Sequence, residues 1–180
     1  EHSYFEFDGL KACVKAAVKA LNEVLDEGLP LHPLEEQRES VRQWRQIGLG
    51  IMGLADALIK LGLTYGEEEA VAMCHRIGFA MADTAIAASA LLAKEEGAYP
   101  MCNIRQVMET PYFQVNTTKK TRELVKKYGL RNSQLLTIAP TGTLSTMLGI
   151  SGGIEPIYAN YYMRKTESLH GTDVYYKVYT

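Results

Sequence analysis

One segment of the sequence combines a proline, a glycine and three hydroxyl side chains: Pro140, Thr141, Gly142, Thr143, Leu144 and Ser145. It follows the apolar run at residues 134–139 and precedes a sequence typical of a helix start. Backbone N–H groups at a helix start, together with hydroxyls, bind anions such as phosphate. The segment lacks the Gly-Lys-Ser/Thr ending of a P-loop. From the pattern alone, a capped turn with Thr143 or Ser145 as N-cap is an equally open interpretation.

A second glycine pattern, GxGxxG, is formed by Gly48, Gly50 and Gly53. In dinucleotide-binding folds such glycines follow a hydrophobic strand, and an acidic residue comes about 20 positions later, at the end of the next strand. Here the preceding residues 42–46 are polar, and the acidic residues 67–69 open a helical pattern. We therefore favour packing glycines and keep a nicotinamide-binding loop as the alternative.

Two further groups of residues offer alternatives of their own. Glu155, between Ile154 and Pro156, has the type of a catalytic carboxylate, although a solvated or turn-stabilising role is more usual without a shifted pKa. Residues 131–133, Arg-Asn-Ser, precede the apolar run and either reach a ligand or fix the loop after Gly129.

The cysteines and histidines do not form a recognisable metal or disulfide pattern. Cys13, Cys74 and Cys102 are far apart and no CxxC occurs, which favours a reducing compartment such as the cytoplasm. The four histidines show no spacing typical of metal ligands. We expect no metal site held by this chain alone.

The charge and the apolar pattern exclude other classes of partner. The 180 residues carry a formal net charge of −2, without the basic surface that nucleic-acid binding requires. The longest unbroken apolar run, residues 47–55, is shorter than a membrane span. The chain opens without a basic and apolar leader. We expect neither direct nucleic acid nor membrane as a partner.

The hydrophobic spacing predicts an α/β protein in which helices dominate the first two thirds. Helices are expected at residues 8–27, with Asp8 as N-cap, and at 54–61, 67–96, 103–109 and 118–128, while 34–46 is a connection or a short helix. The apolar run 134–139 predicts a buried strand, and the tyrosine-rich residues 157–164 and 174–179 predict two more.

Three blocks of the sequence, in this order, resemble the catalytic subunit of ribonucleotide reductases. They are RQIGLGIMGLADALIKLGLTYG, LLAKEEGAYP and GLRNSQLLTIAPTGTLSTMLGISGGIEP. The resemblance extends from about Phe7 to the end of the chain. It implies that residues 140–145 hold the substrate's phosphates, and that the glycines at 48, 50 and 53 serve packing.

The resemblance also implies a fold and a reaction. The fold is a ten-stranded α/β barrel, and the reaction converts ribonucleotides to 2′-deoxyribonucleotides for DNA synthesis. A thiyl radical on a finger-loop cysteine abstracts a hydrogen, and a cysteine pair supplies the electrons. The family's Asn-x-Cys-x-Glu finger motif is not in this sequence. We therefore assign no catalytic residue to this segment.

The resemblance further implies a cofactor and partners. The sequence Pro-Thr-Gly-Thr resembles that of the adenosylcobalamin-dependent branch, because the di-iron branch often has an acidic residue at the position of Gly142. A di-iron radical from a partner subunit is the alternative. The partners implied are a ribonucleotide, the remainder of the catalytic subunit and an external dithiol such as thioredoxin.

We expect residues 1–180 to be a single segment of the barrel domain, with the finger loop and the N-terminal half outside it. On this view the chain is inactive by itself. A nicotinamide-dependent oxidoreductase fragment and a non-catalytic nucleotide-binding module are the alternatives.

Overall fold

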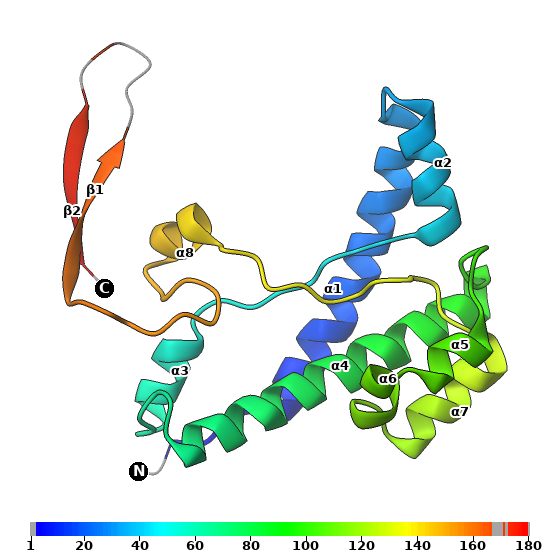
Figure 1. Ribbon diagram of the computed structural model, residues 1–180, viewed down its shortest axis with the longest axis horizontal. Coiled ribbons are helices and arrows are strands. Elements are labelled where there is room, and N and C mark those ends of the chain that lie inside the picture. The colour runs from blue at the N-terminus through cyan, green and yellow to red at the C-terminus, as the bar shows by residue number, and fades with distance from the viewer. Residues whose placement is uncertain (1–2, 167–170, 172, 180) are drawn as a thin grey trace. The chain divides into compact units, whose positions relative to one another are not determined.

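The computed structural model describes residues 3–166, 171 and 173–179, and the chain forms two compact units (Figure 1). One unit holds residues 4–50 and 71–137. The other holds residue 3, residues 51–70 and the described residues from 138 onward. The expectation of a single segment refers to one domain of a larger fold and stays a prediction.

In the first unit, α1 (Phe7–Gly28) and α2 (Glu35–Trp44) are joined by a 3-10 turn (Leu29–Leu31). The N-cap of α1 is Glu6, whose side chain accepts a hydrogen bond of 2.9 Å from the backbone N–H of Asp8. The prediction of Asp8 as N-cap was therefore wrong, because the N-cap lies two residues earlier and Asp8 is already in the first turn. A left-handed residue, Arg45, ends α2.

Helix α4 (Glu68–Glu96) forms the core of the first unit and is crossed by α1 in Figure 1. Its acidic first turn favours the helix dipole, and Gly97, with a φ of +90°, follows its last residue. It is long and apolar enough to cross a membrane, contrary to the expectation from unbroken apolar runs. However, 56% of its most apolar stretch is buried within the protein, as in the core helix of a globular domain.

Three short helices complete the first unit: α5 (Ile104–Glu109), α6 (Pro111–Val115) and α7 (Lys119–Tyr128). Each has an N-cap residue whose side chain accepts a backbone N–H of the first turn. These N-caps are Asn103, Thr110 and Thr118, respectively. Helix α6 was not predicted, although Thr110 and Pro111 form an ordinary helix start.

The predicted buried strand at residues 134–139 was wrong. The segment is extended but pairs only through one parallel bridge, Leu49 with Leu136, in the described part of the chain. Three backbone hydrogen bonds of 2.8–3.0 Å join it to residues 47–49, and the two segments run together in Figure 1. Leu135 is buried, whereas Ile138 is 65% exposed. A strand needs a ladder of backbone hydrogen bonds to a neighbouring strand, and in the described residues the segment forms only this one bridge.

The second unit contains α3 (Leu54–Lys60), the start of α4, α8 (Gly142–Leu148) and a hairpin of β1 (Tyr161–Thr166) and β2 (Val174–Tyr179). The strands are antiparallel, with Tyr161 opposite Tyr179 and Thr166 opposite Val174. Strand β2 was predicted at these residues, whereas β1 begins at Tyr161 and not at the predicted residue 157. The described residues thus form a helix-rich chain with one two-stranded sheet and not a closed barrel, which is consistent with a partial segment.

Candidate functional site

The segment 140–145 forms the start of α8. The N-cap is Thr141, in the left-handed conformation with a φ of +50°, and the helix begins at Gly142. The predicted N-caps Thr143 and Ser145 were therefore wrong, because both lie inside the helix. The first helical hydrogen bond runs from Ser145 N to Thr141 O, at 2.9 Å. The N–H groups of residues 142–144 precede this bond and point away from the helix.

The three hydroxyls of this segment have different surroundings. Ser145 is 4% exposed, and its hydroxyl donates to the backbone oxygen of Thr141 at 2.9 Å. Thr141 Oγ1 accepts from the backbone N–H of Gly153 at 2.8 Å, so its own proton is available for donation. Thr143 is exposed. Ser145 therefore holds the turn, Thr143 offers an exposed hydroxyl, and the Thr141 hydroxyl lies against Gly153.

The outer side of the turn is open to solvent. A Cβ atom added at Gly142 would meet no atom of the described residues within 4 Å. The neighbouring Leu144 is 55% exposed. Gly142 thus leaves space in front of the open N–H groups of α8.

A positive charge lies beside this turn. The guanidinium of Arg164, on β1, is 3.5 Å from the hydroxyl oxygen of Thr143 and 3.4 Å from that of Thr146. Sequence reasoning missed Arg164, because nothing in the pattern brings residue 164 to residues 143–146. In the sequence Arg164 stands out only as a positively charged residue within the predicted strand at residues 157–164.

A second turn, residues 151–153, supports the first from behind. The backbone N–H of Ser151 donates to Asp56 Oδ2 at 2.7 Å, and that of Gly53 donates to Ser151 O at 2.8 Å. The Tyr65 hydroxyl donates to Ile154 O at 2.5 Å. Hydrogen bonding from Ser151 lowers the pKa of Asp56 below its ordinary value. Neither Asp56 nor Tyr65 was predicted to matter.

The GxGxxG segment serves packing. A Cβ at Gly48 would be 3.0 Å from Thr137 Cγ2. Gly53 has a φ of +78°, and a Cβ there would be 3.3 Å from Ile150 Cδ1. Among the described residues no strand ends at Gly48, and the acidic residues lie in the first turn of α4. This arrangement lacks the strand–turn–helix geometry of a dinucleotide-binding loop.

Residues 131–133 were expected either to reach a ligand or to fix the loop after Gly129, and Asn132 does the second. This residue is 0% exposed, and its amide bonds to Asn22, Arg45 and Ser89. Asn132 therefore ties the loop after α7 to α1 and α4. Glu155 is exposed, which agrees with a solvated side chain, and its backbone N–H donates to Gly152 O at 3.0 Å.

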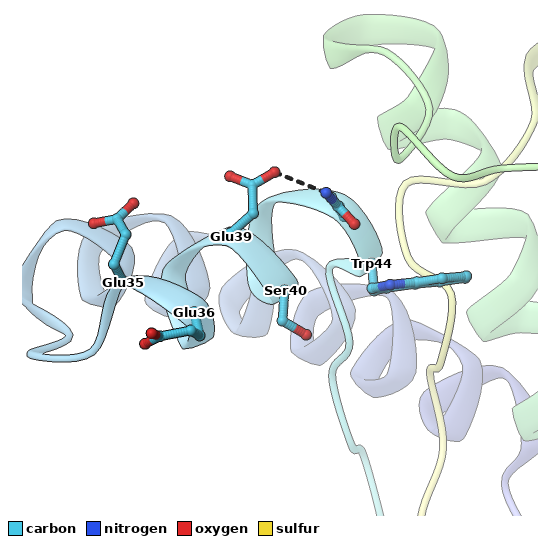
Figure 2. Close-up of a pocket in the computed structure, with 6 residues that line it drawn as sticks. Glu35, Glu36, Glu39, Ser40 and Trp44 are labelled. Atoms are coloured by element: carbon cyan, nitrogen blue, oxygen red, sulfur yellow. Dashed lines mark hydrogen bonds between the residues drawn. The ribbon is translucent and has the colours of Figure 1, made fainter.

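A hollow along α2 has the wrong charge for a phosphate (Figure 2). It is lined by six residues of this one helix: Glu35, Glu36, Glu39, Ser40, Gln43 and Trp44. Hydrogen bonds from Arg42 and Arg38 lower the pKa of Glu35. The hollow therefore carries carboxylates that repel an anionic ligand.

The described residues do not gather metal ligands. In this part of the chain no group of three His, Cys, Asp or Glu side chains is placed to hold an ion. Cys13, Cys74 and Cys102 are free thiols; Cys13 is exposed and the other two are half-buried.

Comparisons with known proteins agree with the resemblance seen in the sequence. The family described as "Ribonucleotide reductase, barrel domain" matches residues 1–179. The chain therefore belongs to the ribonucleotide reductase barrel-domain family.

Several curated relatives are 30–35% identical to the chain. The Chlamydia pneumoniae "Ribonucleoside-diphosphate reductase subunit alpha" is 34% identical, covering 88% of this chain and 17% of the relative. The "Vitamin B12-dependent ribonucleoside-diphosphate reductase" of Mycobacterium tuberculosis is 33% identical, covering 94% and 22%. The protein of the same name from Thermoplasma acidophilum is 35% identical, covering 88% and 18%. The chain thus spans about a fifth of the length of these relatives.

Proposed function

We propose that this chain is a segment of a ribonucleotide reductase catalytic subunit and that it supplies the loop that binds the substrate's phosphates. The whole subunit reduces ribonucleoside diphosphates to 2′-deoxyribonucleotides in the cytoplasm, by a thiyl-radical mechanism. The observation that carries the proposal is the turn at residues 140–145, where the N–H groups at the start of α8 belong to the exposed residues 142–144. Family membership supports the same assignment.

Each group at the turn contributes differently to the binding of a phosphate. The N–H groups of residues 142–144 donate hydrogen bonds toward an anion at the start of α8. Thr141 and Thr143 add hydroxyl donors, and Arg164 adds a full positive charge 3.5 Å from the Thr143 oxygen. Hydrogen bonds between charged partners are stronger than those between neutral ones. This set binds phosphate although the chain's net charge is −2.

The role of this chain in catalysis is to orient the substrate. Holding the phosphates fixes the position of the ribose relative to reacting groups elsewhere in the subunit, and such positioning accelerates a reaction strongly. The thiyl-radical cysteine lies outside this sequence, which lacks the Asn-x-Cys-x-Glu motif. An external dithiol such as thioredoxin supplies the electrons.

We propose adenosylcobalamin as the radical source, with a di-iron radical from a partner subunit as the alternative. Two relatives are named vitamin B12-dependent, and Gly142 stands where the di-iron branch often has an acidic residue. We assign no cobalamin contact to the residues of this chain. We therefore derive no step of the reaction through it from this chain.

Replacing Gly142 by valine in the full-length subunit tests the proposal. A Cβ at Gly142 meets open space, so the fold is expected to tolerate valine, but its side chain would fill the space in front of the N–H groups. We expect the affinity for a ribonucleoside diphosphate to fall about tenfold or more, since one hydrogen bond to a charged group contributes about 1.5–3 kcal/mol.

The matched control is Gly28→Val at the end of α1, where a Cβ also meets no described atom within 4 Å. Equilibrium binding of the nucleotide and thermal unfolding are measured for both variants. An affinity of Gly142→Val equal to that of Gly28→Val contradicts the assignment of the loop.

A further inference from the structure

We infer that Asp56, on α3, is a positioning residue for the phosphate loop and acts through the turn at residues 151–153. The inference rests on the proposed function of residues 140–145. Asp56 lies 85 positions before Thr141 in the sequence. It is linked to the loop through the turn at residues 151–153, which bonds to both Asp56 and Thr141.

The first link joins α3 to the turn. Asp56 lies in the first turn of α3, and its Oδ2 accepts the backbone N–H of Ser151 at 2.7 Å. This distance is typical of a hydrogen bond to an ionised acceptor. The bonds from Ser151 lower the pKa of Asp56, so the carboxylate is charged at neutral pH.

The second link joins the turn to the loop. The backbone N–H of Gly153 donates to Thr141 Oγ1 at 2.8 Å. Thr141 has a φ of +50°, a conformation that is costly for a residue other than glycine and persists only where neighbours hold it. Gly153 lies so close that a Cβ there would be 3.2 Å from Ala139 O. The turn therefore supports the backbone on both sides of Pro140.

Two further contacts fix the turn to the same region of the sequence. Gly53 N donates to Ser151 O at 2.8 Å, so Ser151 is bonded through both its N–H and its carbonyl oxygen. Tyr65 OH donates to Ile154 O at 2.5 Å, just beyond the turn. In Figure 1 the segment after α8 accordingly passes close to the start of α3.

The consequence is that α3 determines the direction of the N–H groups of residues 142–144. Without the Asp56 carboxylate, Ser151 loses an acceptor and the turn is free to shift relative to α3. A shift of about 1 Å in positioning groups is enough to change a rate or an affinity by up to about 100-fold. Loss of Asp56 is thus expected to weaken phosphate binding beyond any loss of stability.

The test uses the full-length subunit with Asp56→Ala and Asp56→Asn. We expect Asp56→Ala to weaken binding of a ribonucleoside diphosphate about tenfold, with KM raised in parallel and kcat at saturating substrate changed less than about threefold. Asp56→Asn keeps an oxygen that accepts the Ser151 N–H, so we expect it to recover most of the affinity.

Asp83→Ala is the matched control. Asp83, on α4, accepts the backbone N–H of Thr118 from a distant segment, also at 2.7 Å. Its loss is expected to lower the unfolding temperature while leaving nucleotide affinity unchanged. If Asp56→Ala and Asp83→Ala behave alike in both measurements, Asp56 has a structural role only and the inference is overturned.

Tyr65→Phe keeps the inference testable if Asp56→Ala does not fold. It removes one hydrogen bond from the same region and is expected to weaken nucleotide binding about threefold. If Asp56→Ala does not fold and the affinity of Tyr65→Phe is unchanged, the inference is overturned. Gly142→Val separates the two claims. Weak binding by Gly142→Val with normal binding by Asp56→Ala refutes the positioning role alone, whereas normal binding by Gly142→Val refutes the loop itself.

Discussion

Replacing Asn132 by alanine is expected to destabilise the first unit by about 3 kcal/mol. The Asn132 side chain is fully buried and makes four hydrogen bonds. Its Nδ2 donates to Asn22 Oδ1 and Arg45 O, both at 2.9 Å, and its Oδ1 accepts from Asn22 Nδ2 at 3.1 Å and Ser89 Oγ at 3.0 Å.

The magnitude follows from these four bonds. At about 0.5–1.5 kcal/mol each, they contribute about 2–6 kcal/mol to the free energy of unfolding. Asn22 retains a bond to Val18 O, and Ser89 Oγ still accepts the N–H of Arg131, so these partners are not left fully unsatisfied. The expected loss therefore lies in the lower half of the range, at about 2–4 kcal/mol.

Urea unfolding of the 180-residue chain, followed by the fluorescence of its one tryptophan, Trp44, measures this loss. Trp44 reports on the network because its backbone oxygen accepts the N–H of Ser133, next to Asn132. Asn116→Ala is the control: its exposed amide donates one hydrogen bond, to Tyr112 O, and its loss is expected to cost less than about 0.5 kcal/mol.

A same-size variant separates the hydrogen bonds from the cavity. Asn132→Asp fills the same volume but removes both donated bonds, so we expect it to destabilise the chain at least as much as Asn132→Ala. The reasoning is refuted if Asn132→Ala costs no more than about 1 kcal/mol, or if Asn132→Asp is as stable as the unaltered chain.

Three other outcomes are expected. Hydrogen bonding from Arg45 lowers the pKa of Asp26, so this pair stabilises the chain fully above the ordinary carboxyl pKa of 3.8 and loses its effect as pH falls through the lower folded value. Acid unfolding should therefore be less steep in Asp26→Asn. Gly48→Ala, whose Cβ would lie 3.0 Å from Thr137 Cγ2, should destabilise the chain by about 1 kcal/mol, and calorimetry should detect no nicotinamide dinucleotide binding before or after the change. The isolated chain should form no detectable deoxyribonucleotide, because the finger-loop motif is missing from its sequence.

Helices were predictable here because their signals are local. Helix α4 follows from an acidic first turn, a long apolar pattern and Gly97, all visible within about 30 residues of sequence. The same local signals located α8 after Pro140, although its N-cap was placed too late. The left-handed conformation of Thr141 was not predictable, because it depends on a hydrogen bond from Gly153 that only the folded loop forms.

The prediction of a strand at residues 134–139 was wrong for a different reason. An apolar run indicates that a segment is suited to burial, but a strand also needs a partner strand to pair with, and that partner lies elsewhere in the chain. The supports of the loop are equally non-local: Asp56 is 95 positions from Ser151, Tyr65 is 89 from Ile154 and Arg164 is 21 from Thr143. Sequence therefore located the loop but could not show what holds it.

The two glycine motifs, which indicate competing functions in the sequence, belong to one structure. The last glycine of GxGxxG, Gly53, donates its N–H to Ser151, immediately after the phosphate segment and α8, and lies against Ile150. The N–H of Gly53 is already hydrogen-bonded, and the side chain of Ile150 already covers this glycine. Gly53 therefore cannot bind a pyrophosphate. Gly53 therefore allows the start of α3 to approach the turn that supports Thr141. A glycine pattern that resembles a cofactor-binding loop in the sequence thus helps to fix a different loop, at residues 140–145. In that loop Gly142 remains open to a ligand.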